Sequence, residues 1–161
     1  MRGTGLWRPC RHHCRIFGGN IVLVGESGTF YPAAGLLDYK TGTLEFVNAG
    51  HNKPLLKHGG TYAWLSERSG MPMGCIEGQH YKLKTTHLAK SDILYTYTDG
   101  VTEAVNEQEE LYGDERLLKL LQTRSTEDVQ ALLELVLADV KQFAGDAEQA
   151  DDITMLAVRQ N

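Results

Sequence analysis

The hydrophobic pattern of this chain changes its period near residue 100, and that change limits the folds available to it. Up to that point apolar residues alternate with polar ones or form short runs between glycine-containing turns, which is typical of β-strands. Beyond it, apolar residues over 129–143 recur on one face at helical spacing. This order of elements predicts an α+β fold in which helices pack on mostly antiparallel sheets.

Glycine-containing turns divide the first half of the chain into two expected hairpins. Gly42, within "DYKTG", offers a positive-φ position between two strands in the range 33–49. Gly59 and Gly60 separate two further strands in the range 53–65. The remaining strands are predicted at residues 81–86, 93–98 and 153–158.

Two helices are predicted in the second half, each with a capping residue. Asp114 is the expected N-cap of a helix that carries leucines over 117–121. Ser125 is the expected N-cap of the longer helix, and Gly145 is its expected end. A single helical turn is expected over 101–105.

Length, charge and cysteine content exclude several classes of protein. The 161 residues suffice for one domain or a large piece of one. A net charge of −5 argues against nucleic-acid binding, which needs a basic surface. Three cysteines do not suggest a disulfide framework, and the apolar run Ile21–Val24 near the start is too short to cross a membrane. We therefore expect a cytoplasmic protein without membrane or nucleic-acid partners.

The start of the chain differs in composition from the rest. Residues 1–24 contain four arginines and no Asp or Glu, whereas the remainder has 21 acidic and 12 basic residues. Such a shift marks a domain boundary or a tail. We expect residues 1–26 to be an atypical N-terminal segment outside the domain and residues 27–161 to form the domain.

Two acidic motifs lie at the ends of predicted strands. Asp99 and Gly100 follow the buried strand in "YTDGVTEA", and Asp151 and Asp152 precede the last strand in "DDITMLAV". Each motif alone is explained as a turn or a strand-end cap. Adjacent carboxylates repel one another, however, and a divalent cation reverses that effect. Hard cations such as Mg²⁺ and Mn²⁺ prefer such oxygen ligands.

A third polar group is the cluster around His51 in "NAGHN", also at the end of a predicted strand. The histidine is a candidate ligand or proton donor. Histidines in such positions more often hydrogen-bond their own loop, and we favour that interpretation.

In combination, these motifs resemble the metal-dependent protein phosphatases (protein phosphatase 2C-like), in particular the bacterial SpoIIE-like serine phosphatases. The resemblance covers roughly residues 27–159. It is carried by the order "SGTF", "AAGLLDYKTGTLEFVNAGHNKPLL", "GMPMG", "DILYTYTDGVTEA", "YGDERLLKLL" and "DDITMLAV".

The resemblance implies an α/β/β/α sandwich of two antiparallel sheets between helical layers, which would be incomplete in this chain. It also implies a pair of Mg²⁺ or Mn²⁺ ions that activate water for attack on phosphoserine or phosphothreonine. By motif match, Asp99 and Asp151 correspond to catalytic metal ligands. Asp152 is a further candidate ligand, or orients a ligand or water. Gly100 would shape the turn, and His51 stays a loop or outer-shell candidate.

One motif of the family has no counterpart in this sequence. The family places another metal-bridging aspartate in a "D-x-x-G-H-G" motif near the start of the domain. The acids before residue 50 are Glu26, Asp38 and Glu45, and none stands in that context. We therefore expect a truncated domain with weak metal binding and little or no hydrolysis. The implied substrate is a phosphoserine protein, such as an antagonist of an anti-sigma factor.

Three rival interpretations of the motifs are possible. A haloacid dehalogenase-type phosphatase would need its nucleophilic aspartate where Tyr97 stands, and a tyrosine cannot form an aspartyl-phosphate. A phosphoprotein-binding domain without catalysis is the stronger rival, and a metal titration separates it from an enzyme. A zinc site over residues 10–14 ("CRHHC") is disfavoured, because adjacent histidines do not easily reach one ion.

Overall fold

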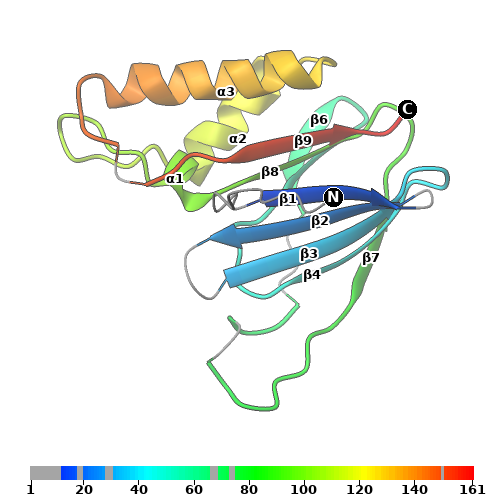
Figure 1. Cartoon of the computed structure of the whole chain (residues 1–161). Coiled ribbons are helices and arrows are strands. Elements are labelled where there is room, and N and C mark those ends of the chain that lie inside the picture. The colour runs from blue at the N-terminus through cyan, green and yellow to red at the C-terminus, as the bar shows by residue number, and fades with distance from the viewer. Residues whose placement is uncertain (1–11, 18–19, 28–30, 66–68, 73–74, 150) are drawn as a thin grey trace, which may run out of the picture.

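The computed structural model describes residues 12–17, 20–27, 31–65, 69–72, 75–149 and 151–161. These residues form two stacked antiparallel sheets, with the two longer helices lying over the outer face of one sheet (Figure 1). The expected α+β class and antiparallel pairing are therefore confirmed.

The first sheet has the strand order β1-β2-β3-β4-β7. Its strands are β1 (His12–Phe17), β2 (Asn20–Ser27), β3 (Tyr31–Asp38), β4 (Thr43–Asn48) and β7 (Lys84–His87). The second sheet has the order β6-β5-β8-β9. Its strands are β5 (Leu55–His58), β6 (Thr61–Trp64), β8 (Ile93–Tyr97) and β9 (Met155–Arg159). The helices are α1 (Asp99–Thr102), α2 (Asp114–Thr123) and α3 (Val129–Ala144).

Two hydrophobic clusters hold these layers together. One lies between the second sheet and the helices and includes Tyr62, Tyr95, Tyr97, Leu117, Leu132 and Val136. The other lies between the two sheets and contains Leu37, Leu44, Phe46, Leu88 and Leu94. Because β8 contributes to both clusters, it is buried on both faces and forms a rigid support for whatever follows it. Among the described residues, no helix has the length and apolar character needed to cross a membrane.

The β3–β4 turn closes around Gly42 as the sequence predicts, with φ at 74°. The N–H of Gly42 donates to the carbonyl of Asp38 at 2.7 Å, and its own carbonyl accepts from Leu88 N–H at 2.8 Å. A Cβ atom at Gly42 would lie 2.2 Å from the Leu88 carbonyl oxygen. The glycine therefore serves both the turn and the close contact with the segment after β7.

The sequence did not predict β1 and β2, which lie largely within the segment 1–26. β2 pairs with β3 along its whole length, and β1 pairs with β2. The strands were missed because the arginine-rich composition of this segment suggested a tail. The short apolar run Ile21–Val24 in fact forms the middle of β2. The domain boundary near residue 26 stays a prediction, and the side chains of the "CRHHC" motif lie outside the described part of the chain.

The predicted helix caps need correction. The N-cap of α3 is Asp128 rather than Ser125, because the Asp128 side chain accepts hydrogen bonds from the N–H groups of Gln130 and Ala131 at 2.8 and 3.0 Å. Asp114 is likewise the first residue of α2 and not its cap. The late start of α3 leaves the residues before Asp128 outside the helix.

The buried charge of Lys57 is paired with groups in the segment just before Asp128. The residue is only 4% exposed, and its Nζ donates to the carbonyl of Thr126 at 3.1 Å and pairs with the carboxylate of Glu127. Replacing Lys57 with methionine should lower the free energy of unfolding by about 1–3 kcal/mol, because the Thr126 carbonyl loses its donor. Glu127→Gln should cost less, since that side chain is 58% exposed. Urea denaturation measures both losses, and an equal loss in the two variants would contradict this assignment.

Candidate functional site

Thr98 joins the end of β8 to the segment that leads into β9. Its hydroxyl donates to the carbonyl of Asp152 at 2.8 Å and accepts from the N–H of Thr154 at 2.9 Å. Its own N–H donates to the Thr154 carbonyl at 2.9 Å. Thr98 is fully buried, so these bonds are protected from water. They place the two acidic motifs of the sequence side by side.

Gly100 allows the second acidic motif to approach α1 closely. A Cβ atom at this position would lie 2.6 Å from the carbonyl oxygen of Asp152 and 3.0 Å from that of Asp151. Real Cβ atoms essentially never come so close to backbone atoms. Gly100 is therefore required for space, whereas the resemblance implied only that it shapes the turn.

The three predicted carboxylates differ in environment. Asp99 begins α1, and its Oδ1 atom is buried without a hydrogen-bond partner in the described part of the chain. Asp151 is half-buried, and its Oδ1 accepts from the N–H of Asp152 at 2.7 Å. Asp152 is exposed. The backbone of Gly100, next to Asp99, lies against the backbone of Asp151 and Asp152, so the two acidic motifs meet between the end of β8 and the start of β9.

His51 is buried beside this point, with only 3% of its surface exposed. Its Nδ1 lies 2.9 Å from the carbonyl oxygen of Asn52, which can only accept, so Nδ1 carries the proton. Burial lowers the pKa of His51, while the Asn52 carbonyl and the negative charge of Asp99 act in the opposite direction. The ring is therefore neutral near pH 7, and it lies within the electrostatic reach of Asp99.

Asn48 holds the loop that carries His51. Its side-chain amide donates to the carbonyl of His51 at 3.0 Å, and its Oδ1 accepts from the N–H of Gly50 at 3.0 Å. Its backbone N–H donates to the Ser69 hydroxyl at 2.9 Å, and its carbonyl accepts from Ser69 N–H at 3.0 Å. Asn48 is 2% exposed and thereby fixes the loop to the end of β4.

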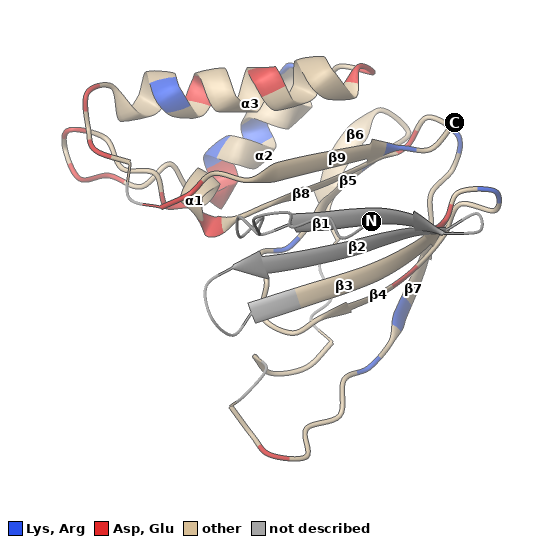
Figure 2. Cartoon of the chain, in the orientation of Figure 1, with Lys and Arg blue, Asp and Glu red and all other residues tan. Residues whose placement is uncertain are grey.

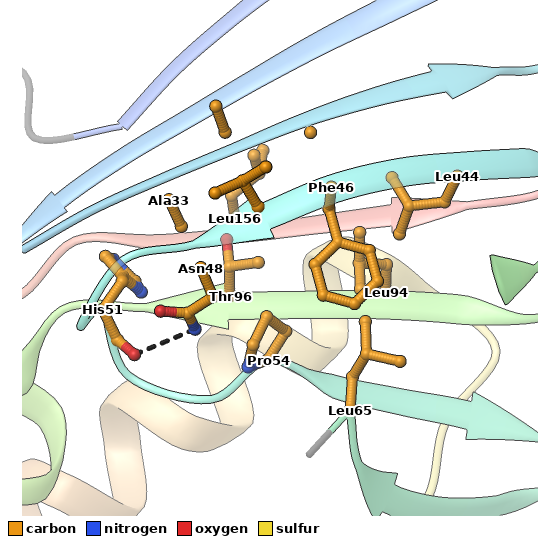
Figure 3. Close-up of a pocket in the computed structure, with 13 residues that line it drawn as sticks. Ala33, Leu44, Phe46, Asn48, His51, Pro54, Leu65, Leu94, Thr96 and Leu156 are labelled. Carbon is orange, nitrogen blue, oxygen red and sulfur yellow. Dashed lines mark hydrogen bonds between the residues drawn. The ribbon is translucent and has the colours of Figure 1, made fainter. Parts of the chain in front are cut away.

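Two hollows meet at His51. The first is an apolar cavity of about 40 Å³ between the sheets, with Phe46, Leu94 and Leu156 among its walls and His51 and Asn48 at one end (Figure 3). The second is a polar pocket of about 360 Å³, here called the loop pocket. It lies between the loop after β4, the end of α1 and the start of α2. Its walls include His51, Lys53, Thr102, Glu103, Leu111 and Asp114.

The donor set fits part of a two-metal centre. The buried Oδ1 of Asp99 and the carboxylate of Asp151, in the adjoining acidic motif, are hard oxygen ligands of the kind that Mg²⁺ and Mn²⁺ take. Magnesium sites often use one or two carboxylates and complete their shell with water. Within the described ranges, however, no group of three or more His, Cys, Asp or Glu side chains is arranged to hold an ion. Asp99 and Asp151 thus fit as ligands, and a third carboxylate does not join them there.

Sequence reasoning identified the acidic motifs but missed the residues that bring them together. Thr98 was assigned only to the strand, although its place directly before Asp99-Gly100 was the available signal. Asn48 was noted as part of a polar cluster without a role. The link to Ser69 had no signal, because the two residues are 21 positions apart.

Comparisons with known proteins point to one family. The model of the family "Stage II sporulation protein E (SpoIIE)" matches residues 26–161. Protein IcfG of Synechocystis sp. is 26% identical over 127 residues, which are 79% of this chain and 20% of that protein.

Solved structures share the fold. The SiaA-PP2C domain of Pseudomonas aeruginosa has a TM-score of 0.70 at 20% identity, covering 88% of this chain and 52% of that one. The phosphatase domain of SpoIIE from Bacillus subtilis, presoaked with Mn, has a TM-score of 0.62 at 19% identity, covering 80% and 56%. This chain spans about half the length of these solved chains and a fifth of IcfG. The chain belongs to the SpoIIE family, whose PP2C-like phosphatase domains are metal-dependent.

Proposed function

We propose that this chain supplies two metal ligands, Asp99 and Asp151, to a Mn²⁺- or Mg²⁺-dependent protein phosphatase centre that hydrolyses phosphoserine or phosphothreonine. The observation that carries the proposal is the buried Oδ1 of Asp99, which has no hydrogen-bond partner in the described part of the chain. The next residue, Gly100, lies against the backbone of Asp151. A buried carboxylate oxygen without a donor is costly unless a cation or water satisfies it. Membership of the SpoIIE family supports the same chemistry.

Each residue of the site has a role in this proposal. Asp99 and Asp151 hold the ions, and the exposed Asp152 orients a ligand or water from outside. Thr98 and Gly100 keep the two acidic motifs in contact. When bound, the ions supply an activated water and neutralise charge on the phosphoryl oxygens. Gly100 and His51 hold no ion in this scheme.

The substrate that fits this proposal is a phosphoserine protein, such as an antagonist of an anti-sigma factor. Support comes from the relatives, one of which is described as the phosphatase domain of the cell fate determinant SpoIIE. The net charge of −5 favours a protein partner over nucleic acid. A cytoplasmic location and the absence of a membrane partner belong to the same proposal.

We expect this chain to bind metal weakly and to show little or no hydrolysis. Two carboxylates contribute less charge and less fixed geometry than the three or more ligands of a complete two-metal site. The alternative function is a phosphoprotein-binding domain without catalysis, and the small described ligand set favours it specifically. Metal stoichiometry separates the two, because an enzyme needs a pair of ions and a binding domain needs none.

Asp99→Asn should weaken Mn²⁺ binding by at least roughly tenfold, because even outer-shell partners of metal ligands contribute that much. Asp151→Asn should have a similar effect. Asp146→Asn is the matched control, since Asp146 is an exposed acid in the segment between α3 and Asp151. Electron paramagnetic resonance of Mn²⁺ measures binding, and release of phosphate from a phosphoserine peptide measures turnover. Equal Mn²⁺ affinity in all four proteins would exclude the proposed site.

A further inference from the structure

The loop pocket lies directly beside the proposed metal site. Thr102, the last residue of α1, forms part of its wall, and Asp99 is the first residue of the same short helix. His51 also lines the pocket and lies within the electrostatic reach of Asp99. At about 360 Å³ the pocket is large enough for a long side chain. A phosphoprotein bound at Asp99 would therefore place its neighbouring residues in or over this pocket.

Two acidic residues from different elements line this pocket. Glu103 follows α1, and Asp114 begins α2. Asp114 is held in position by the hydroxyl of Tyr97, which donates to its Oδ1 at 3.1 Å. Tyr97 is buried, and this burial raises the pKa of its hydroxyl far above its usual value, so the hydroxyl stays a donor. Asp114 is thus a pre-positioned acceptor, which costs little to order when a ligand binds.

The surroundings of the pocket add a charge preference and an apolar contact. Figure 2 shows several Asp and Glu positions along α1 and the adjoining loops. Lys53 also lines the pocket. Leu111, also in the wall, is 61% exposed. Long basic side chains bury their methylene groups on such apolar surface while the charged head reaches polar partners.

We propose that the loop pocket binds an arginine or lysine side chain close to the phosphoserine of the substrate, with Glu103 and Asp114 as the recognising carboxylates. This inference rests on the proposed phosphatase function. An acidic substrate side chain would meet two like charges here. An apolar side chain would gain contact with Leu111. It would also remove water from both carboxylates without offering them a hydrogen-bond donor. A guanidinium suits the site best, because it donates to carboxylates from several N–H groups.

The test compares short phosphoserine peptides that differ in one flanking residue, which is arginine, alanine or glutamate. Binding is measured by fluorescence anisotropy in the presence of Mn²⁺. The arginine peptide should bind roughly fivefold more tightly than the alanine peptide, as expected for a partly exposed ion pair, and the difference should shrink at high salt. Glu103→Gln and Asp114→Asn should each reduce this preference, whereas Lys53→Gln should increase it, because Lys53 repels the incoming cation.

Equal binding of the arginine and alanine peptides would overturn the inference, as would a preference that survives both carboxylate substitutions. Glu103 is exposed, so Glu103→Gln keeps the test valid if Asp114→Asn disturbs the start of α2. The same peptides without phosphate are measured in parallel. If Asp99→Asn leaves Mn²⁺ binding unchanged, the proposed phosphatase site is wrong. The loop pocket is still supported in that case if the unphosphorylated peptides show an arginine preference that Glu103→Gln removes.

Discussion

Replacing Gly100 with alanine is expected to separate α1 from the Asp151–Asp152 segment and to lower the free energy of unfolding by about 2–3 kcal/mol. The added Cβ would lie 2.6 Å from the backbone carbonyl of Asp152, and backbone atoms cannot move aside as a side-chain end can. Alanine has the higher helix propensity, but that gain is about 1 kcal/mol and is smaller than the expected clash. The substitution should also weaken Mn²⁺ binding, because Asp99 and Asp151 then lie farther apart.

Gly70→Ala is the matched control for this prediction. Its added Cβ would meet the ring of Tyr81 at 3.0 Å, and Tyr81 is only partly buried, so its ring can shift. Urea denaturation and Mn²⁺ titration of both variants give the comparison. If Gly100→Ala is as stable as the parent chain, the close approach described above does not exist in solution.

Replacing Asn48 with alanine should release the loop that carries His51. Two side-chain hydrogen bonds are lost, to the carbonyl of His51 and from the N–H of Gly50, and each contributes about 1–1.5 kcal/mol in a buried place. We expect a total loss of about 2–3 kcal/mol in the free energy of unfolding. The pKa of His51 should rise toward its usual value, because burial is what lowers it.

The control is Asn52→Ala. His51 uses the backbone carbonyl of Asn52 and not its side chain, so this substitution should leave the ring hydrogen bond intact. Chemical denaturation measures stability, and an NMR titration of the His51 ring measures its pKa. An unchanged pKa of His51 in Asn48→Ala would show that the loop does not depend on Asn48.

Local features of the sequence predicted most of the architecture. The positive-φ glycine at Gly42, the buried run that becomes β8 and the helical stripe of α3 all depend on residues close together in the chain. The N-cap of α3 was predicted wrongly at Ser125. The cap is Asp128, because its carboxylate accepts hydrogen bonds from two N–H groups of the first turn.

The contacts that assemble the site were beyond sequence reasoning. The bond from Thr98 to Asp152 joins residues 54 positions apart, and it exists only because β8 pairs with β9. The role of Gly100 depends on the same pairing, since its crowding comes from another segment's backbone. The motifs therefore indicated the candidate carboxylates. The two acidic segments meet because β8 pairs with β9, which the motifs do not show.

The junction made by Thr98 has a thermodynamic consequence. Any cation that engages Asp99 and Asp151 together favours the state in which the end of β8 and the start of β9 are joined, so its binding energy adds to conformational stability. At a cation concentration a hundredfold above Kd, this gain is about 2.7 kcal/mol. Resistance of the chain to heat thereby becomes a readout of cation affinity even when no substrate is turned over.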